Sequence, residues 1–234
     1  MIYLDHAATT PLDGEVLQAM MPYLTDVYGN PSSQHSAGRE AANAVTAARD
    51  TIARIVGVPA SNIYFTAGGT EAANTALKGV CAASRERGRH IVLSSIEHPA
   101  LLESARDMYA YGWELTLVDP DGNGIISPDS IAKALRPDTV FVGVMAANNE
   151  VGTVQPIADI YAVVKRHGAF FFSDCVQTAG VLPFAQFPSD GMGFSAHKFY
   201  GPKGVGVLYM KGGARFARLL SGGNQERGLR AGTT

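Results

Sequence analysis

The feature of this sequence that most constrains its fold is the alternation of short apolar runs with stretches of helical periodicity. We expect strands at residues 63–65, 90–95, 113–118, 140–147 and 169–173, with helices at 71–87, 99–111, 128–135 and 157–167 between them. Two earlier helices are expected, one starting at residue 13 and one over 35–56. This alternation predicts an α/β domain whose largely parallel sheet is wrapped by helices.

Composition narrows the classes of function. Of the 234 residues, 46% are hydrophobic and 17% are charged, which is typical of a globular protein with a sizeable core. The net charge of -2 offers no electrostatic basis for binding nucleic acid or an anionic membrane. No apolar run is long enough to span a bilayer, and the N-terminus lacks the features of a signal peptide.

The histidines and cysteines indicate neither a metal site nor a disulfide framework. The histidines fall at no recognised zinc-ligand spacing, so we predict no metal. Cys81 and Cys175 form no CxxC pair, a usage that suits a reducing compartment. We therefore expect a cytoplasmic protein.

Candidate site residues follow the predicted strands, because ligands of such sheets bind at the carboxyl ends of the strands. After the strand at 63–65 comes a glycine turn with a hydroxyl, at 67–71, that opens a helix. Backbone amides and a hydroxyl at a helix N-terminus can bind a phosphate, although an ordinary capped helix start has the same composition.

Other strand ends carry side chains with useful chemistry. His98 follows the strand at 90–95 and precedes a proline, so it fits either a site or the first turn of a helix. Two amides, Asn148 and Asn149, follow the strand at 140–147, where they require a polar ligand or a turn network. Asp174 follows a phenylalanine-rich strand, and a carboxylate there needs a cationic partner unless it lies in a surface loop.

Lys198 lies on a tight turn between the apolar runs 191–194 and 205–209, with Ser195 and His197 just before it. A lysine amine held out of bulk water can lose its proton and form a Schiff base with a carbonyl, whereas a solvated loop lysine does neither. An anion-binding turn, an imidazole, an amide, a carboxylate and a lysine at successive strand ends make up the set needed to bind pyridoxal 5'-phosphate (PLP).

With these residues the chain resembles the cysteine desulfurases of the NifS/IscS type, in the class V aminotransferase family of fold-type I PLP enzymes. The resemblance extends over the whole chain, with the motifs in family order. The matching segments are 3–11 (YLDHAATTP), 28–33 (YGNPSS), 65–71 (FTAGGTE), 97–98 (EH), 148–152 (NNEVG), 173–177 (SDCVQ), 195–198 (SAHK) and 226–233 (ERGLRAGT). The resemblance implies the large domain of a PLP-dependent transferase, a three-layer sandwich with a mostly parallel mixed sheet flanked by helices.

The resemblance also implies roles around the cofactor ring. Lys198 resembles the lysine that binds PLP covalently and later moves protons. His98 resembles the imidazole that stacks on the ring and acts as an acid–base group. Asp174 resembles the partner of the ring nitrogen and Gln177 the donor to the phenolic oxygen, while Asn149 resembles the amide near that oxygen and the substrate carboxylate.

For the phosphate, the resemblance implies a second group of residues. The ligands within one chain are Gly69, Thr70, Ser195 and His197. Thr233 matches a threonine that completes the phosphate site of the neighbouring subunit, so a homodimer is implied.

The reaction implied is removal of sulfur from L-cysteine, which leaves L-alanine and a persulfide on an enzyme cysteine. Sulfur then passes to an acceptor protein of iron–sulfur cluster assembly or tRNA thiolation. Two alternatives remain: another class V enzyme, such as a selenocysteine lyase or an aminotransferase, and a non-catalytic PLP-binding scaffold.

One departure from the family pattern affects the expected domains. The family's nucleophilic cysteine and substrate-binding arginine belong to a region beyond Thr234, and neither Cys81 nor Cys175 matches the nucleophile. We expect residues 1–14 to pack on an absent C-terminal small domain and residues 15–234 to form the PLP-binding large domain. Apolar surface would then be exposed at 1–14 and near 219–220, and the isolated chain would be incomplete for catalysis.

Overall fold

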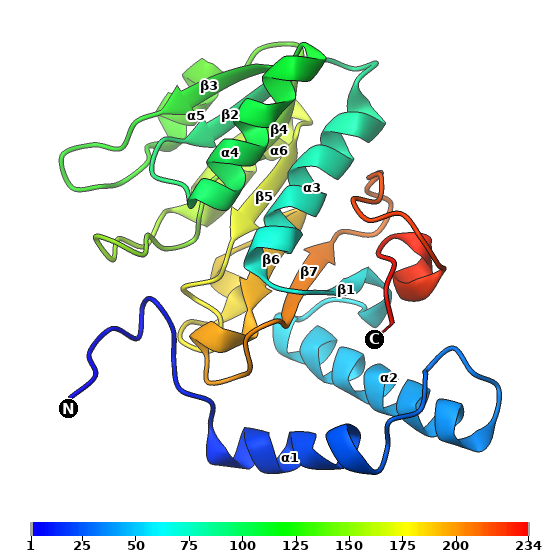
Figure 1. Cartoon of the computed structure of the whole chain (residues 1–234). Coiled ribbons are helices and arrows are strands. Elements are labelled where there is room, and N and C mark those ends of the chain that lie inside the picture. Colours follow the sequence, from blue (N-terminus) through cyan, green and yellow to red (C-terminus); the bar gives the residue numbers. More distant parts are fainter. Residues whose placement is uncertain (1, 234) are drawn as a thin grey trace.

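The computed structural model describes residues 2–233 as one seven-stranded sheet with helices on both faces (Figure 1). The strand order is β1-β7-β6-β5-β4-β2-β3. Pairing is parallel from β3 through β2, β4 and β5 to β6, and β7 is antiparallel to both of its neighbours. The predicted α/β class and three-layer sandwich with a mostly parallel mixed sheet are confirmed.

The elements agree with the expected alternation. The strands are β1 (Ile63–Thr66), β2 (His90–Ser94), β3 (Glu114–Val118), β4 (Thr139–Gly143), β5 (Phe170–Asp174), β6 (Gly191–Ser195) and β7 (Gly206–Met210). The α-helices are α1 (Gly14–Thr25), α2 (Ser36–Val56), α3 (Gly69–Ser84), α4 (Pro99–Asp107), α5 (Pro128–Ala134) and α6 (Ile157–His167). Short 3-10 turns include Met108–Tyr111 after α4 and Ala196–Lys198 after β6.

The core lies on both faces of the sheet. On one face, α3 and α4 pack through Leu77 and Leu101 against Phe141 of β4. On the other, α5 and α6 pack through residues such as Ile160 against Phe171 of β5. Every residue of β2 and β4 is buried, as expected for central parallel strands covered by helices on both sides.

The strand expected at 140–147 is only partly correct. Strand β4 ends at Gly143, and the chain continues buried to Ala147, which makes an isolated antiparallel bridge with Val154. Beyond Gly143 the backbone still contacts β5, since the N–H of Ala146 donates to the carbonyl of Asp174 at 2.8 Å. The apolar run therefore reflects burial that continues past the end of the regular strand.

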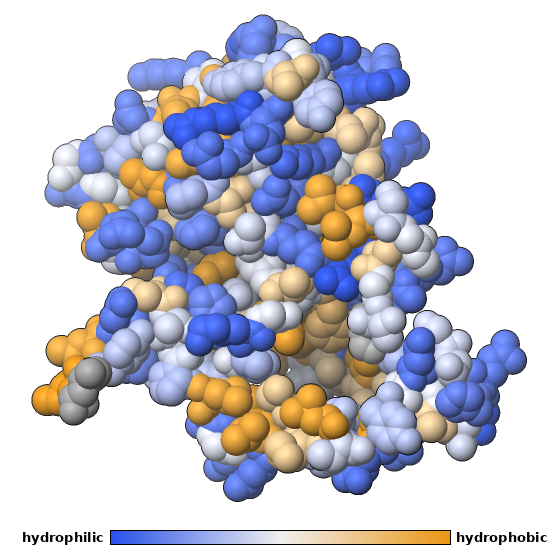
Figure 2. All heavy atoms as spheres, viewed as in Figure 1, coloured by the Kyte–Doolittle hydropathy of each residue, from blue (hydrophilic) through white to orange (hydrophobic). Residues whose placement is uncertain are grey.

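Residues 2–25 differ from the rest of the described chain because they bury little apolar surface. Helix α1 has no buried residue, and Ile2 and Leu4 are 86% and 87% exposed. Apolar side chains gather over α1 in the space-filling view (Figure 2). The domain division into 1–14 and 15–234 stays a prediction, and its outer limits, residues 1 and 234, lie outside the described residues. None of the helices between residues 2 and 233 is long and apolar enough to cross a membrane.

Candidate active site

A cleft of about 950 Å³ opens at the carboxyl ends of β2, β4, β5 and β6. It brings together nine of the ten residues expected from the sequence. They are Gly69, Thr70, His98, Asn149, Asp174, Gln177, Ser195, His197 and Lys198. Thr233 is exposed and is not among the residues that line the cleft.

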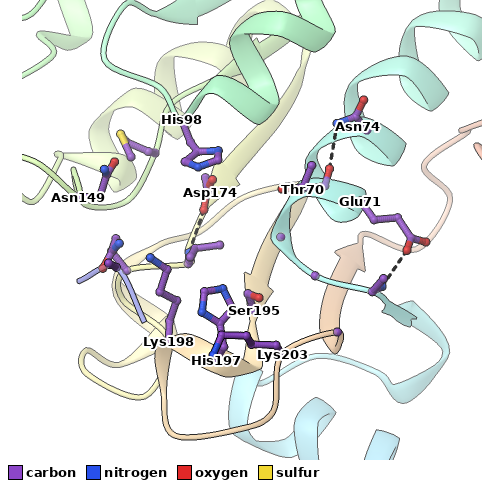
Figure 3. Close-up of a pocket in the computed structure, with 18 of the residues that line it drawn as sticks. Thr70, Glu71, Asn74, His98, Asn149, Asp174, Ser195, His197, Lys198 and Lys203 are labelled. Carbon is purple, nitrogen blue, oxygen red and sulfur yellow. Dashed lines mark hydrogen bonds between the residues drawn. The ribbon is translucent and has the colours of Figure 1, made fainter. Parts of the chain in front are cut away.

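Lys198 is held by the 3-10 turn that follows β6, and its side chain points into the cleft (Figure 3). Its Nζ donates a hydrogen bond to the carbonyl oxygen of Ala7. Burial lowers the pKa of the amine, and the charges of Asp174 and Asp5 oppose that shift. The amine is therefore closer to its neutral, nucleophilic form than that of a solvated lysine.

Asp174 is the last residue of β5 and is only 8% exposed. Its Oδ1 accepts a hydrogen bond from the backbone N–H of Val176 at 2.9 Å. Burial raises its pKa, while the charges of His98 and Lys198 lower it to a smaller extent. Within residues 2–233 no lysine or arginine forms a salt bridge with this carboxylate, although the cleft opens onto it.

His98 caps the N-terminus of α4, and Pro99 begins that helix. The Nδ1 atom of His98 accepts a hydrogen bond from the backbone N–H of Ala100 at 3.1 Å. This bond assigns the proton of the neutral imidazole to Nε2. The ring lies beside Asp174 at the border of the cleft (Figure 3). His98 therefore caps helix α4 and also lines the cleft, so the two possibilities left open above are compatible.

The predicted anion-binding turn lies where β1 passes into α3, and it depends on glycine. Gly68 has φ +156°, and a Cβ on Gly69 would lie 2.7 Å from the Val176 side chain. A Cβ on Gly206 of β7 would lie 2.5 Å from the Cα of Gly68. The turn can therefore approach the sheet closely and keep its amides at the cleft, with the hydroxyl of Thr70 beside them.

Residues at the end of β6 form the other side of the anion-binding turn. Ser195, the last residue of β6, is 4% exposed and lines the cleft. The Nδ1 atom of His197 lies 3.1 Å from the hydroxyl of Thr9. Burial and the charges of Lys198 and Lys203 lower the pKa of His197, so its imidazole is neutral at pH 7 and fits a hydrogen-bonding role.

Glu71, in the first turn of α3, lines the cleft and holds the backbone of the anion-binding turn. Its Oε2 accepts the backbone N–H of Ala67 at 2.7 Å. Arg230 donates through Nε to Oε1 of Glu71 at 2.9 Å, and a second nitrogen of its guanidinium lies 3.2 Å from Oε2. The segment that carries Arg230 is itself attached to β1, since Glu226 accepts from Arg49 and from the backbone of Phe65.

Asn148 and Asn149, which follow β4, have different surroundings. The side-chain oxygen of Asn148 accepts the backbone N–H groups of Glu150 and Val151, and its Nδ2 donates to the carbonyl of Ile96 at 3.0 Å. Asn148 therefore belongs to a turn network, one of the two explanations left open above. Asn149 lines the cleft, and its Nδ2 donates to Oε1 of Glu150 at 2.8 Å.

The N-terminal segment forms a wall of the cleft that strand-end reasoning missed. The carbonyl of Ala7 accepts hydrogen bonds from Lys198 and, at 2.9 Å, from Gln177. The backbone N–H and hydroxyl of Thr10 both donate to the carbonyl of His197. Asp5 and Ala7 line the cleft. The sequence indicated this segment only through the matching motif at 3–11, in which no residue was given a role in the site.

Both cysteines are buried. Cys81 and Cys175 have no exposed surface, and burial raises the pKa of Cys175 to about 12 and that of Cys81 further still. Neither thiol is accessible or ionised at neutral pH, so neither is suited to act as a nucleophile.

The sequence matches a known family. The family model of class V aminotransferases matches residues 2–233, and the chain belongs to that family.

The chain is similar to cysteine desulfurases in sequence and in structure. It is 46% identical to "Cysteine desulfurase IscS" of Dictyoglomus turgidum and 47% identical to "Putative cysteine desulfurase IscS 1" of Bacillus subtilis, over 99% of its length. It spans 59% and 62% of those two relatives. A solved NifS-like protein superposes with a TM-score of 0.96 at 41% identity, covering 100% of this chain and 65% of the other. A solved SspA in complex with cysteine gives 0.95 at 37%, covering 100% and 69%.

Proposed function

We propose that the cleft binds PLP and that Lys198 is its covalent anchor. One observation carries this proposal: the Lys198 amine and the buried Asp174 carboxylate share a cleft with an amide-lined turn at a helix N-terminus. A buried carboxylate without a cationic partner is costly, and a protonated ring nitrogen would supply that partner.

The residues present fit the three parts of this cofactor. The turn at 68–70, with Ser195 and His197, offers donors for a phosphate, and glycine leaves room for it. Asp174 would pair with the ring nitrogen, and the flat imidazole of His98 lies beside that carboxylate (Figure 3). Gln177 and Asn149 line the same cleft and would approach the phenolic oxygen.

When bound, PLP supplies an electron sink that stabilises negative charge at a substrate carbon. The protein's part is to position and transfer protons. Lys198, with its lowered pKa, can accept a proton at Nζ. His98 can donate a hydrogen bond from its Nε2–H, because its Nδ1 accepts the Ala100 N–H. The N-terminal wall at Ala7 holds the lysine and excludes water from one side.

As the reaction we propose desulfuration of L-cysteine to L-alanine, with transfer of sulfur to a thiolate. The likeness to cysteine desulfurases and to a structure solved in complex with cysteine supports this choice. Because Cys81 and Cys175 are buried, the thiolate is not expected from either. An acceptor protein of iron–sulfur cluster assembly or tRNA thiolation would take the sulfur, in the cytoplasm. The exposed position of Thr233, away from its own cleft, suits the homodimer in which it would complete a neighbour's phosphate site.

The test is to add L-cysteine to the PLP-loaded protein and to follow both the visible spectrum of the cofactor and the release of alanine. We expect L-cysteine to change the spectrum and the Lys198→Ala variant to show no such change. A stronger response to selenocysteine, or keto acid formation without alanine, would instead assign the chain to another class V activity. PLP binding with no response to any amino acid would indicate a scaffold.

A further inference from the structure

Glu97 is a buried carboxyl group next to His98, and none of the roles proposed above uses it. The side chain is 4% exposed. Its Oε1 accepts a hydrogen bond from the Ser94 hydroxyl and another, at 2.7 Å, from the backbone N–H of Met145. Its Oε2 is buried and has no hydrogen-bond partner within residues 2–233. A buried acid with one unpartnered oxygen requires an explanation.

The surroundings of Glu97 favour the neutral acid. No lysine, arginine or histidine between residues 2 and 233 forms a salt bridge with it, and the nearby carboxylate of Asp174 disfavours a second negative charge. Burial raises its pKa to about 8; the hydrogen bonds from Ser94 and Met145 oppose this shift, and the charge of Asp174 adds to it to a smaller extent. At pH 7 the group is therefore mostly protonated.

The contacts of Glu97 join two strand ends of the cleft. Ser94 is the last residue of β2, and Met145 follows β4 and lines the cleft. The Asn148 side chain makes a second connection between the same two exits, to the carbonyl of Ile96. The turn that carries His98 is thus attached twice to the chain that leaves β4. If the bond from Met145 were lost, one of these two attachments would be gone and His98 would be less firmly placed.

We propose that Glu97 is a positioning residue of the site: as a neutral acid, it holds the turn of His98 against the exit of β4 without adding a second carboxylate charge beside Asp174. This inference rests on the proposed function, since His98 must face bound PLP for its placement to matter.

The experiment compares two variants of the PLP-loaded protein, Glu97→Gln and Glu97→Met. Glutamine keeps an acceptor oxygen for Ser94 and Met145 and carries no charge. Methionine keeps the length and an apolar body, so it is compatible with the buried position, but it cannot replace the oxygen. Visible circular dichroism and absorption of bound PLP report the packing of the ring, titration with PLP gives its affinity, and thermal unfolding reports stability. Glu103→Gln, at an exposed position of α4, is the matched control.

We expect Glu97→Gln to retain the wild-type visible spectrum and the PLP affinity within about twofold, and Glu97→Met to alter the dichroism and weaken binding by about tenfold. A Glu97→Gln variant as impaired as Glu97→Met would overturn the neutral role. A Glu97→Met variant that loses thermal stability but keeps the spectrum and affinity would reduce Glu97 to a purely structural residue. If the wild type shows no PLP spectrum at all, the proposed function fails, and that outcome is distinct from both.

Discussion

Two glutamates, Glu71 and Glu97, support different parts of the cleft. Glu71 forms an ion pair with Arg230 and holds the backbone of the anion-binding turn. Glu97 accepts two hydrogen bonds but has no cationic partner among the described residues, and its neighbour Asp174 is also a buried acid. In the proposed PLP site, backbone amides of the turn would bind the phosphate, and the ion pair of Glu71 supports the turn. Around the ring, a neutral Glu97 would leave the carboxylate of Asp174 to act on the ring nitrogen.

We expect the largest loss of PLP affinity from a substitution of Asp174, the proposed partner of the ring nitrogen. Asp174→Asn keeps the shape but removes the charge, so a protonated ring nitrogen would lose its partner. We expect PLP affinity to fall by about 10²-fold and the visible spectrum to change, because hydrogen bonds between charged groups are worth more than neutral ones. Titration with PLP measures this, with Asp107→Asn on the exposed surface as control. An affinity within threefold of wild type would show that Asp174 is not the partner of the ring nitrogen.

For the anion-binding turn, the prediction concerns the close approach of its backbone to β7. A Cβ on Gly206 would lie 2.5 Å from the Cα of Gly68, and neither backbone can shift cheaply. We expect Gly206→Ala to weaken PLP binding by about tenfold and to leave the weaker binding of pyridoxal, which has no phosphate, nearly unchanged. Gly122→Ala, where a Cβ would contact nothing, is the control. An equal loss for both ligands would mean that the substitution acts beyond the turn.

A pH series tests the charge state of Glu97 without cofactor. The folded pKa of about 8 exceeds the usual 4.5, so the folded protein binds more protons than the unfolded chain between these values. Stability from this group is therefore fully present below pH 4.5 and is lost at up to about 1.4 kcal/mol per unit as pH rises toward 8. Urea unfolding from pH 5 to 9 should show this slope in the wild type relative to Glu97→Gln. Parallel pH profiles for the two proteins would mean that Glu97 is ionised throughout.

The smallest effect is expected for the ion pair at the turn. Glu71→Gln retains an acceptor for Ala67 and loses only the charge opposite Arg230, whose side chain is 21% exposed. We expect a loss of about 1 kcal/mol in unfolding free energy and less than about a threefold change in PLP affinity. Chemical unfolding and PLP titration check both values. A tenfold loss of affinity would show that the carboxylate itself sets the anion site.

Features that depend on neighbouring residues could be predicted from the sequence, whereas contacts between distant residues could not. The helices and most strands followed from apolar periodicity, and His98, Asp174 and Lys198 could be found because each lies at the end of a strand or within four residues after it. The supports of the turn could not be found in this way, because Glu71 and Arg230 are 159 residues apart and the Gly68–Gly206 approach depends on strand pairing.

Burial is the other feature that the residue pattern left undetermined. The run at 140–147 is buried throughout, but the regular strand β4 ends at Gly143, and composition does not show where a buried strand ends. In the sequence, Glu97 stands out only as part of the matching segment 97–98, and its hydrogen bonds with Ser94 and Met145 are visible only in the structure.

Reduction of the PLP-loaded protein with borohydride, followed by peptide mass spectrometry, shows which lysine binds PLP covalently. The Schiff base should be trapped on Lys198, and the Lys198→Ala variant should carry no label. Lys203 also lines the cleft and provides an internal comparison. A label on Lys203, or none on any lysine, would contradict the assignment of this cleft as a PLP site anchored by Lys198.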